Sequence, residues 1–567
     1  MTNYELLRII NFVERMRAPF DENVQSATPD AVWNIVLSLM KSHLRGESVT
    51  MSSLASSSQI PFPSAMRKIH QLIANGDIDQ YRRKSTGKAT LLAPSAKLKM
   101  SFATYAKKAK AVLSDTWGVG IGGANSEDYY FGAAHLEDQT VPPLNLIEQR
   151  HTPHQGLRFL LHDDSYFASM RNLLSDFRSK LSPRQNFQLV PLSELYATLF
   201  KKQTANASEY DIIAIDIAWL GEAISRKIIR PLDPFLGSRD IDPLDFHPTV
   251  WATGSWGSEQ FGIPIYSTFE ALAVRKDLFD DRGLGMPTSF DKVIDAARQL
   301  HQPKRGLNGI VWNAAKGAPI AQTFMFLMGC CGASVINVPV SGSAIDYSHL
   351  ARDMYRPRVQ SEQGRQVLDY MRQLLKYSPP DILELDWNRA LDYFMNGEAS
   401  MLYCWTMRAS RLEYDAESKV KRKVEYLAHP HGAGGSTVSP VGGFLLTIPA
   451  NLSPDRAKLA FDAISWMASP SAMKEHVKNG IPIAPCFSVK ADPEATITAP
   501  IVRLVERLAR HNRLPTWQRP PIREYGEVER ILGENIFAAL RGELTDAQAL
   551  EKSQNEIDVV MRQGGRY

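Results

Sequence analysis

Two carboxylates and an aromatic ring follow a predicted strand in the first third of the chain. Residues 157–161 (Leu-Arg-Phe-Leu-Leu) form a short apolar run that predicts a buried strand, and Asp163, Asp164 and Tyr166 come shortly after it. Carboxylates accept hydrogen bonds and aromatic rings offer flat apolar faces, so these residue types could hold a small polar ligand. The alternative is that the aspartate pair only caps the helix that follows.

A second predicted strand ends in the same way. Residues 210–215 (Tyr-Asp-Ile-Ile-Ala-Ile) are followed by Asp216 and, three residues later, by Trp219. A charge placed directly after a buried strand is costly unless the structure gives it a purpose. We therefore assign Asp216 and Trp219 to the same candidate ligand site.

Strands and helices alternate around these residues. The apolar periodicity predicts strands at 157–161, 187–192 and 210–215, with helices at 166–180 and 193–203 between them. Such alternation is typical of α/β proteins with a parallel sheet. In these folds the loops at the carboxyl ends of the strands carry the ligand, which is where the acidic residues lie.

The first 115 residues have a different pattern. A helix is predicted over residues 63–75, because Pro63 suits a first helical position and Gly76 suits a stop. Its apolar residues fall on one face, and Ser64, Arg67, Lys68 and Gln71 point away from that face.

A basic hairpin is predicted after this helix. Residues 81–92 read as a strand, a turn at residues 85–87 and a returning strand. The hairpin carries the basic residues Arg82, Arg83, Lys84 and Lys88.

The basic residues of this region are candidates for DNA contacts. Residues 1–110 hold 16 Lys and Arg against 8 Asp and Glu, whereas the remainder holds 49 against 53. The positive charge thus gathers where a polyanion would be met. The helix residues could contact bases or phosphates and the hairpin residues a minor groove, the alternative being a solvated basic surface.

In its order of elements, the region of residues 1–115 resembles the MarR-like winged-helix regulators. It departs from that family at the wing tip, where Ser85-Thr86-Gly87 stands in place of the usual aspartate. The resemblance implies an α+β winged helix-turn-helix domain that binds double-stranded DNA as a homodimer. We expect the dimer to pair through helices of residues 5–45 and to place its recognition helices about 34 to 36 Å apart.

From residue 156 to residue 567, after a connector at 116–155, the chain resembles the family 1 extracellular solute-binding proteins, the class of sugar receptors. The match rests on an ordered set of short motifs spread over about 400 positions. The motifs are Tyr210–Glu222, Ile229–Asp233, Phe261–Tyr266, Ala273–Phe279, Gly285–Asp291, Phe394–Met401, Gly442–Phe444, Ala463–Ser469, Gly480–Pro485 and Ala538–Gly542.

The resemblance implies a two-lobed α/β domain of the periplasmic-binding type II class that closes on a solute. Carbohydrates present hydroxyl groups and apolar ring faces, so their sites combine carboxylates with aromatic side chains. The resemblance also places a ligand contact near Trp405 and Arg408. The remaining ligand candidates are Trp256, Tyr266, Trp312 and Gly443, for which a core position or, for the glycine, a plain turn is the alternative.

Together the two parts predict a one-component transcriptional regulator that senses a sugar or oligosaccharide and couples lobe closure to DNA binding. The first alternative is the solute-binding receptor of an ABC-type sugar transporter. The second is a carbohydrate-active enzyme on this scaffold. We find no Gly-x-Ser-x-Gly elbow or His-Glu-x-x-His pair, so no enzyme is predicted.

The remaining composition predicts a cytoplasmic protein without a metal or other cofactor. The first thirty residues carry acidic groups that interrupt every apolar stretch, so no export signal is visible, and no apolar run is long enough for a membrane span. Four cysteines form no disulfide framework, which fits a reducing compartment. His429-Pro430-His431 lacks a third ligand and is interpreted as an ordinary loop.

Overall fold

The computed structural model divides the chain into two compact units, which are described separately. The first contains the described residues from the N-terminal part, and the second contains nearly all of those from 156 onward. The structure describes residues 10, 31–45, 48–58, 60–82, 90–102, 104–106, 156–164, 167, 186–200, 208–236, 241–340, 345–415, 417–470, 472–473, 486, 514–515 and 518–567.

The first unit packs helices against a small antiparallel sheet. The strands lie in the order β1-β3-β2, and Ile35, Leu54, Ile69 and Leu92 belong to one buried core. The elements in chain order are α2 (Ala31–Arg45), β1 (Val49–Thr50), α3 (Met51–Ser56), α4 (Phe62–Ala74), β2 (Ile78–Arg82) and β3 (Thr90–Pro94).

Local sequence explains where these helices begin. Thr50 caps α3 through a capping box with Ser53, so two backbone N–H groups at the helix start are satisfied. Pro63 lies in the first turn of α4, where its missing N–H costs nothing, as the sequence predicts. The predicted helix at 63–75 thus matches α4 within one residue.

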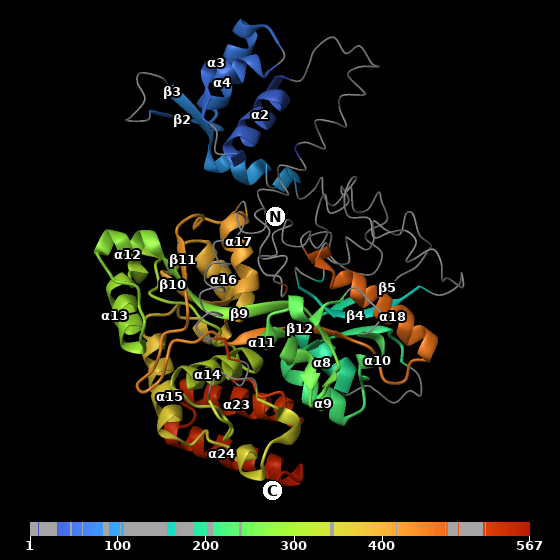
Figure 1. The fold of residues 1–567 in the computed structure, drawn as a ribbon. Coiled ribbons are helices and arrows are strands. Elements are labelled where there is room, and N and C mark those ends of the chain that lie inside the picture. The colour runs from blue at the N-terminus through green and yellow to red at the C-terminus, as the bar shows by residue number, and fades with distance from the viewer. Residues whose placement is uncertain are drawn as a thin grey trace. The chain divides into compact units, whose positions relative to one another are not determined.

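The second unit is built on a mixed sheet of seven strands (Figure 1). Six strands lie in the order β10-β9-β12-β6-β4-β5, and β11 pairs with β9. Their bounds are β4 (Arg158–His162), β5 (Asn186–Val190), β6 (Ile212–Asp216), β9 (Ile263–Arg275), β10 (Met401–Trp405), β11 (Val424–Leu427) and β12 (Val441–Thr447).

The long strand β9 joins two lobes. Its first part, residues 263–269, pairs with β12, and its last part, residues 270–275, pairs with β10 and β11. Lobe 1 is therefore the sheet of β5, β4, β6, β12 and the first part of β9. Lobe 2 is the sheet of β10, β11 and the rest of β9.

Helices cover both lobes. In lobe 2, α14 packs on α23, which packs on α24, and α15 contacts both α14 and α24 (Figure 1). Lobe 1 carries α8 (Leu192–Phe200), α9 (Leu220–Ser225), α10 (Asp233–Leu236), α11 (Pro248–Trp251) and α18 (Pro454–Met467). Lobe 2 carries α12 (Lys276–Arg282), α13 (Phe290–Leu300), α14 (Ala318–Cys330), α15 (Glu362–Leu375), α16 (Trp387–Met395), α17 (Ala409–Tyr414), α23 (Tyr525–Leu540) and α24 (Asp546–Gln563).

The structure confirms the three predicted strands and corrects the prediction of a parallel sheet. β4 pairs in parallel with β5 and with β6, as expected from strand and helix alternation. However, β12 is antiparallel to both β6 and β9. Local alternation of strands and helices cannot predict this pairing, because β12 comes from a distant part of the chain. The predicted helix at 166–180 lies outside the described residues, apart from Phe167. In the part of the chain that the structure describes, no helix has the length and apolarity needed to cross a bilayer.

Candidate functional site

Charged and aromatic side chains from both lobes meet around the part of β9 where the lobes join. Asp164 follows β4, Asp216 ends β6, and Tyr266 lies on β9 just before the junction. Trp405 and Arg408 come from the end of β10 in lobe 2. Arg519 comes from the segment before α23. We call these six residues the interlobe cluster.

Asp164 anchors the lobe 1 side of the cluster. Its Oδ2 accepts a hydrogen bond of 2.5 Å from the hydroxyl of Tyr266 and lies 3.2 Å from His162 Nδ1. Its Oδ1 accepts from the backbone N–H of Phe167 at 2.8 Å, which is the capping role given above as the alternative. Burial raises the pKa of Tyr266 well above its ordinary value, and the charge of Asp164 adds to this. Tyr266 is therefore a neutral donor held in one place.

A buried ion pair forms the second part of the cluster. Arg519 Nη1 donates to Asp216 Oδ2 at 3.0 Å, and the Arg519 guanidinium lies 5.5 Å from the centre of the Trp405 ring. Only 3% of the Arg519 side chain and 9% of the Asp216 side chain are exposed. Burial lowers the pKa of Arg519, but the charge of Asp216 outweighs it and keeps the arginine charged. Asp216 also caps the following turn by accepting from Ala218 N–H at 2.9 Å.

Gly442 makes room for this pair. A Cβ atom at residue 442 would lie 2.6 Å from the Trp405 ring and 3.2 Å from Arg519 Nη2. The glycine in β12 therefore lets the tryptophan and the arginine lie directly against backbone, and any larger residue would displace them.

Arg408 supplies the positive charge that faces Asp164 and Tyr266. Its Nη1 donates to Asn388 Oδ1, whereas its buried Nε has no hydrogen-bond partner within the described residues. Burial lowers the pKa of Arg408, and the nearby Asp164 and Tyr266 oppose this effect. Arg519 Nε is likewise buried without a described partner. A buried unpaired donor is costly, so both N–H groups are suited to a ligand that accepts hydrogen bonds.

A second polar layer adjoins the cluster in lobe 2. Glu270, which is 1% exposed, pairs across the sheet with Trp405 and accepts a hydrogen bond of 3.0 Å from Asn313 Nδ2. Its other oxygen lies 3.1 Å from Nε2 of the buried His429. His429, predicted to lie in an ordinary loop, therefore has a buried acidic neighbour on the strand that pairs with β10.

Three predicted ligand residues pack elsewhere in the two lobes. Trp219 is buried in lobe 1 with its ring centre 5.2 Å from that of Tyr196. Trp312 is fully buried in lobe 2, where its Nε1 donates to Ser378 Oγ at 3.1 Å. Trp256 is half-buried on a short hairpin beside Gly221. All three rings therefore pack against other parts of the protein, as aromatic side chains in or near a core do.

The remaining predicted ligand residues have varied positions. Gly443 has φ +134°, and a Cβ atom there would lie 2.3 Å from the Tyr266 carbonyl oxygen, so this glycine permits the close pairing of β12 and β9. Asp163 is exposed beside Asp164, and Tyr166 lies outside the described residues. The interlobe cluster therefore gathers Asp164, Asp216, Tyr266, Trp405 and Arg408 from the prediction.

The predicted DNA contacts can be placed only in part. Arg67, Lys68 and Gln71 are exposed on α4. Ser64 is half-buried, and its hydroxyl oxygen accepts a hydrogen bond of 3.4 Å from Arg67 Nη2. Arg82 ends β2, but its side chain is not described. Arg83, Lys84 and Lys88 lie outside the described residues.

Sequence reasoning missed Arg519. The residue lies 303 positions after its partner Asp216, so no local period joins them. The available signal was its sequence neighbourhood, because the apolar residues Trp517, Pro520 and Pro521 flank this one arginine along the chain. A charge in such a setting needs a buried partner.

A known family model matches the second unit. The model is that of the bacterial extracellular solute-binding proteins, and it matches residues 186–474, about half of the chain. The matched region includes Asp216, Tyr266, Trp405 and Arg408 of the interlobe cluster, together with the strands β6, β9 and β10 that carry them. It does not include the N-terminal residues that form most of the first unit.

Two relatives and one solved structure are similar to this chain. A probable amino-acid ABC transporter periplasmic-binding protein, y4oP, from Sinorhizobium fredii is 22% identical over 72% of this chain and 90% of its own length. The mannitol-binding protein of Pseudomonas aeruginosa is 24% identical over 63% of this chain and 81% of its own length. A solute-binding protein from Agrobacterium radiobacter, in complex with ribitol, is 24% identical and covers 72% of this chain and all of its own, with a TM-score of 0.66.

These similarities correct two predictions. The cytoplasmic location predicted from the sequence is wrong, because the family is extracellular and y4oP is a periplasmic-binding protein. The similarities also favour the alternative of a transporter receptor over the predicted transcriptional regulator. Relatives that are binding proteins agree with the expectation that the chain is not an enzyme. DNA and a second copy as partners stay predictions.

Proposed function

We propose that this chain, which belongs to the bacterial extracellular solute-binding protein family, binds a sugar or polyol at the interlobe cluster and serves as the solute receptor of an ABC-type transporter. The observation that carries the proposal is that charged side chains of both lobes converge at the ends of strands on either side of the junction. A solute held there would bridge the lobes and favour their closed arrangement, through its higher affinity for that state.

The chemistry of the cluster favours a solute with many hydroxyl groups. Hydroxyls both donate and accept hydrogen bonds. They can therefore donate to Asp164 and accept from the Nε groups of Arg408 and Arg519, which have no partner among the described residues. Two of the similar proteins are described with polyols, mannitol and ribitol.

An acyclic polyol fits this cluster better than a pyranose. A sugar ring stacks on an open aromatic face, but Trp219 and Trp312 pack in the cores of their lobes. Trp405 is 7% exposed and lies against Arg519, Phe326 and Gly442. Recognition by hydrogen bonds alone suits a flexible polyol.

The proposal can be tested by replacing Arg408 and measuring solute affinity. We expect Arg408→Gln to weaken the binding of D-mannitol or ribitol at least tenfold in isothermal titration, because a charged donor to the solute is removed. Arg389→Gln is the matched control, since Arg389 lies on α16 next to Asn388 and pairs with Asp381 at 2.9 Å. Equal affinities of wild type and Arg408→Gln would contradict the proposed site.

The first unit supports a second candidate function, the binding of double-stranded DNA. Its order of helix, strand, two helices and two further strands is similar to that of winged-helix domains, which supports this proposal. α4 buries Ala65, Ile69 and Leu72 and leaves Arg67 and Lys68 toward solvent. Such a helix can enter a major groove with its basic residues toward the DNA.

Salt dependence tests this second function. We expect the full chain to bind duplex DNA at low salt. Arg67→Gln with Lys68→Gln should lower the slope of log affinity against log salt by about 0.9 for each phosphate that α4 no longer neutralises. Lys97→Gln with Lys99→Gln removes the same charge from the helical residues 96–102 of this unit, where both lysines are exposed and Lys97 pairs with Asp77 at 2.9 Å. An equal fall in both double variants would point to general electrostatics instead of α4.

A further inference from the structure

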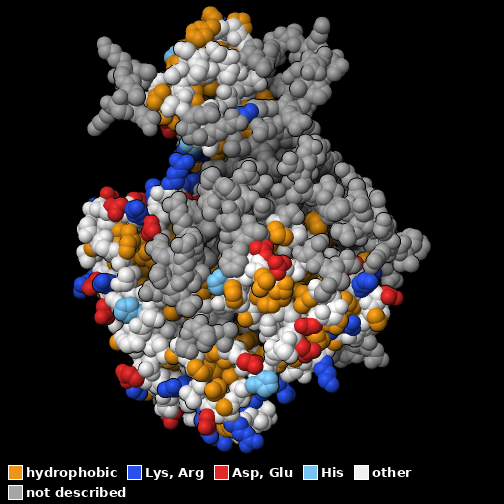
Figure 2. Space-filling model, viewed as in Figure 1, with side chains coloured by type: hydrophobic (Ala, Val, Ile, Leu, Met, Phe, Trp, Pro, Cys, Tyr) orange, Lys and Arg blue, Asp and Glu red, His pale blue; other side chains and the backbone are white. Residues whose placement is uncertain are grey.

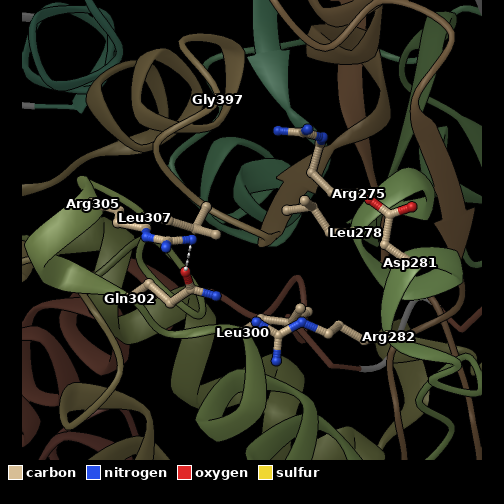
Figure 3. A pocket seen from close by; sticks show the side chains of 9 residues that line it. All are labelled: Arg275, Leu278, Asp281, Arg282, Leu300, Gln302, Arg305, Leu307 and Gly397. Atoms are coloured by element: carbon tan, nitrogen blue, oxygen red, sulfur yellow. Dashed lines mark hydrogen bonds between the residues drawn. The ribbon is translucent and has the colours of Figure 1, made fainter.

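Lobe 2 has a pocket that the proposed function does not use. It encloses about 330 Å³ between the end of β9, α12, the turn after α13 and the turn after α16 (Figure 3). Its lining residues are Arg275, Leu278, Asp281, Arg282, Leu300, Gln302, Arg305, Leu307 and Gly397. None of them belongs to the interlobe cluster, so this pocket is a separate feature of the fold.

A buried arginine forms one wall of the pocket. Arg275, the last residue of β9, is 8% exposed. Its Nε and Nη2 donate to the two oxygens of Asp277 at 2.8 and 2.6 Å, which fixes the plane of the guanidinium. The remaining nitrogen, Nη1, would lie 3.5 Å from a Cβ atom at Gly397, another lining residue. Nη1 thus lies beside Gly397, which has no side chain to cover it.

Two further guanidinium groups border the same space. Arg305 Nη1 donates to Gln302 Oε1 at 3.4 Å, and Arg282 Nη1 donates to the Gln299 carbonyl at 3.5 Å. Both side chains are exposed, and both bonds are long and to neutral acceptors. Asp281 is the one carboxylate among the lining residues. With Asp277 balancing Arg275, the pocket keeps a net positive charge.

The floor of the pocket is apolar. Leu278 comes from α12, Leu300 ends α13, and Leu307 follows the next turn. Figure 3 shows the leucine side chains between the three arginines. Over α12 and α13 the outer surface carries acidic and basic groups side by side (Figure 2). A concave site with an apolar lining and a few placed charges is the usual form of a small-molecule site.

We propose that this pocket binds a small organic anion, whose carboxylate or phosphate group contacts Arg275 at one wall and whose apolar part lies against the leucines, with Arg282 and Arg305 supplying positive charge from the other sides. Guanidinium groups match such oxyanions in geometry and charge. Nη1 of Arg275 supplies one fixed donor. Arg282 and Arg305 can turn toward the anion, because their hydrogen bonds to described residues are long and have neutral acceptors.

The test uses benzoate and phenyl phosphate as probes, with benzyl alcohol as the uncharged analogue, titrated into the full chain at low ionic strength. We expect at least one of the two anions to bind with a dissociation constant in the millimolar range or below, and benzyl alcohol to bind at least tenfold more weakly. The tighter anion then identifies the charged group that the pocket prefers. Absence of binding by both anions at about 10 mM, a concentration that millimolar affinity would saturate, or equal binding of benzyl alcohol, would overturn the proposal.

Variants locate the binding. Arg282→Gln with Arg305→Gln should weaken the anion at least tenfold, whereas Arg298→Gln with Arg365→Gln, two exposed arginines on α13 and α15, should change it less than twofold. Equal weakening in both double variants would show that the pocket is not the site. Polyol affinity should be unchanged in all of them, so failure of this proposal is distinguishable from failure of the interlobe site.

Discussion

Replacement of Asp216 by asparagine tests the buried ion pair that joins lobe 1 to the C-terminal segment. Asparagine keeps an oxygen that can accept from Ala218 N–H, so the cap of the following turn is retained. In the wild type, Asp216 Oδ2 lies 3.0 Å from Arg519 Nη1. The variant removes this negative charge, so the arginine stays buried against Trp405 without a carboxylate partner.

The expected cost is large for a conservative change. Removing one partner of a buried ion pair typically lowers the free energy of unfolding by about 3 to 5 kcal/mol. Glu529 also acts on the charge of Arg519, so we expect Asp216→Asn to lie at the lower end, about 3 kcal/mol. Asp295→Asn is the control, because Asp295 forms an exposed pair with Arg298 and should cost at most about 1 kcal/mol.

The assay is urea unfolding followed by tryptophan fluorescence. Eight of the ten tryptophans lie after residue 200, so the signal reports mainly on the second unit. A cost under about 1 kcal/mol in Asp216→Asn, equal to that of Asp295→Asn, would refute the assignment of Asp216 and Arg519 as an essential pair.

Three more predictions concern other parts of the second unit. Tyr266→Phe should weaken polyol binding in isothermal titration several-fold, because Asp164 loses the donor that holds it; unchanged affinity would argue against that role. Burial raises the pKa of Asp211, but hydrogen bonds from Arg456 and from Arg158 outweigh this and hold it below the ordinary value. The ionised carboxylate therefore stabilises the fold at pH values above its unfolded pKa of about 3.9, and this contribution is lost as the pH falls through the folded pKa. Because Asp211→Asn has no such carboxylate, its free energy of unfolding should decline less steeply in acid than that of the wild type. An equally steep decline in urea titrations of this variant would argue against that role. Trp312→Phe should lower the melting temperature but leave polyol affinity within twofold, and a tenfold loss of affinity would place its ring at the solute.

The strand-end rule located the acidic half of the interlobe cluster. Asp164 and Asp216 are predicted because they follow apolar runs whose alternation with helices fixes their place at the carboxyl edge of a sheet. The same rule cannot separate Trp219 from Trp405, because one lies just after a buried strand and the other at the end of one, and their rings differ in what they pack against. Which of the two rings lies near the interlobe cluster depends on tertiary contacts.

Contacts between distant parts of the chain account for the features that the sequence did not predict. The antiparallel strand β12 lies between β6 and β9, although 224 residues separate the end of β6 from the start of β12, and no local pattern specifies such an insertion. Arg519 reaches Asp216 for the same reason. Local signals were sufficient for α4, where Pro63 and the apolar face determine both the start of the helix and its buried side.

A crystal structure of the chain with its tightest-binding polyol tests the proposed function most directly. We predict that the polyol lies between the lobes, with hydroxyl groups within hydrogen-bond distance of Asp164 and of Arg408 Nε. A polyol bound elsewhere, with both of these groups still facing only protein, would contradict the interlobe cluster as the solute site.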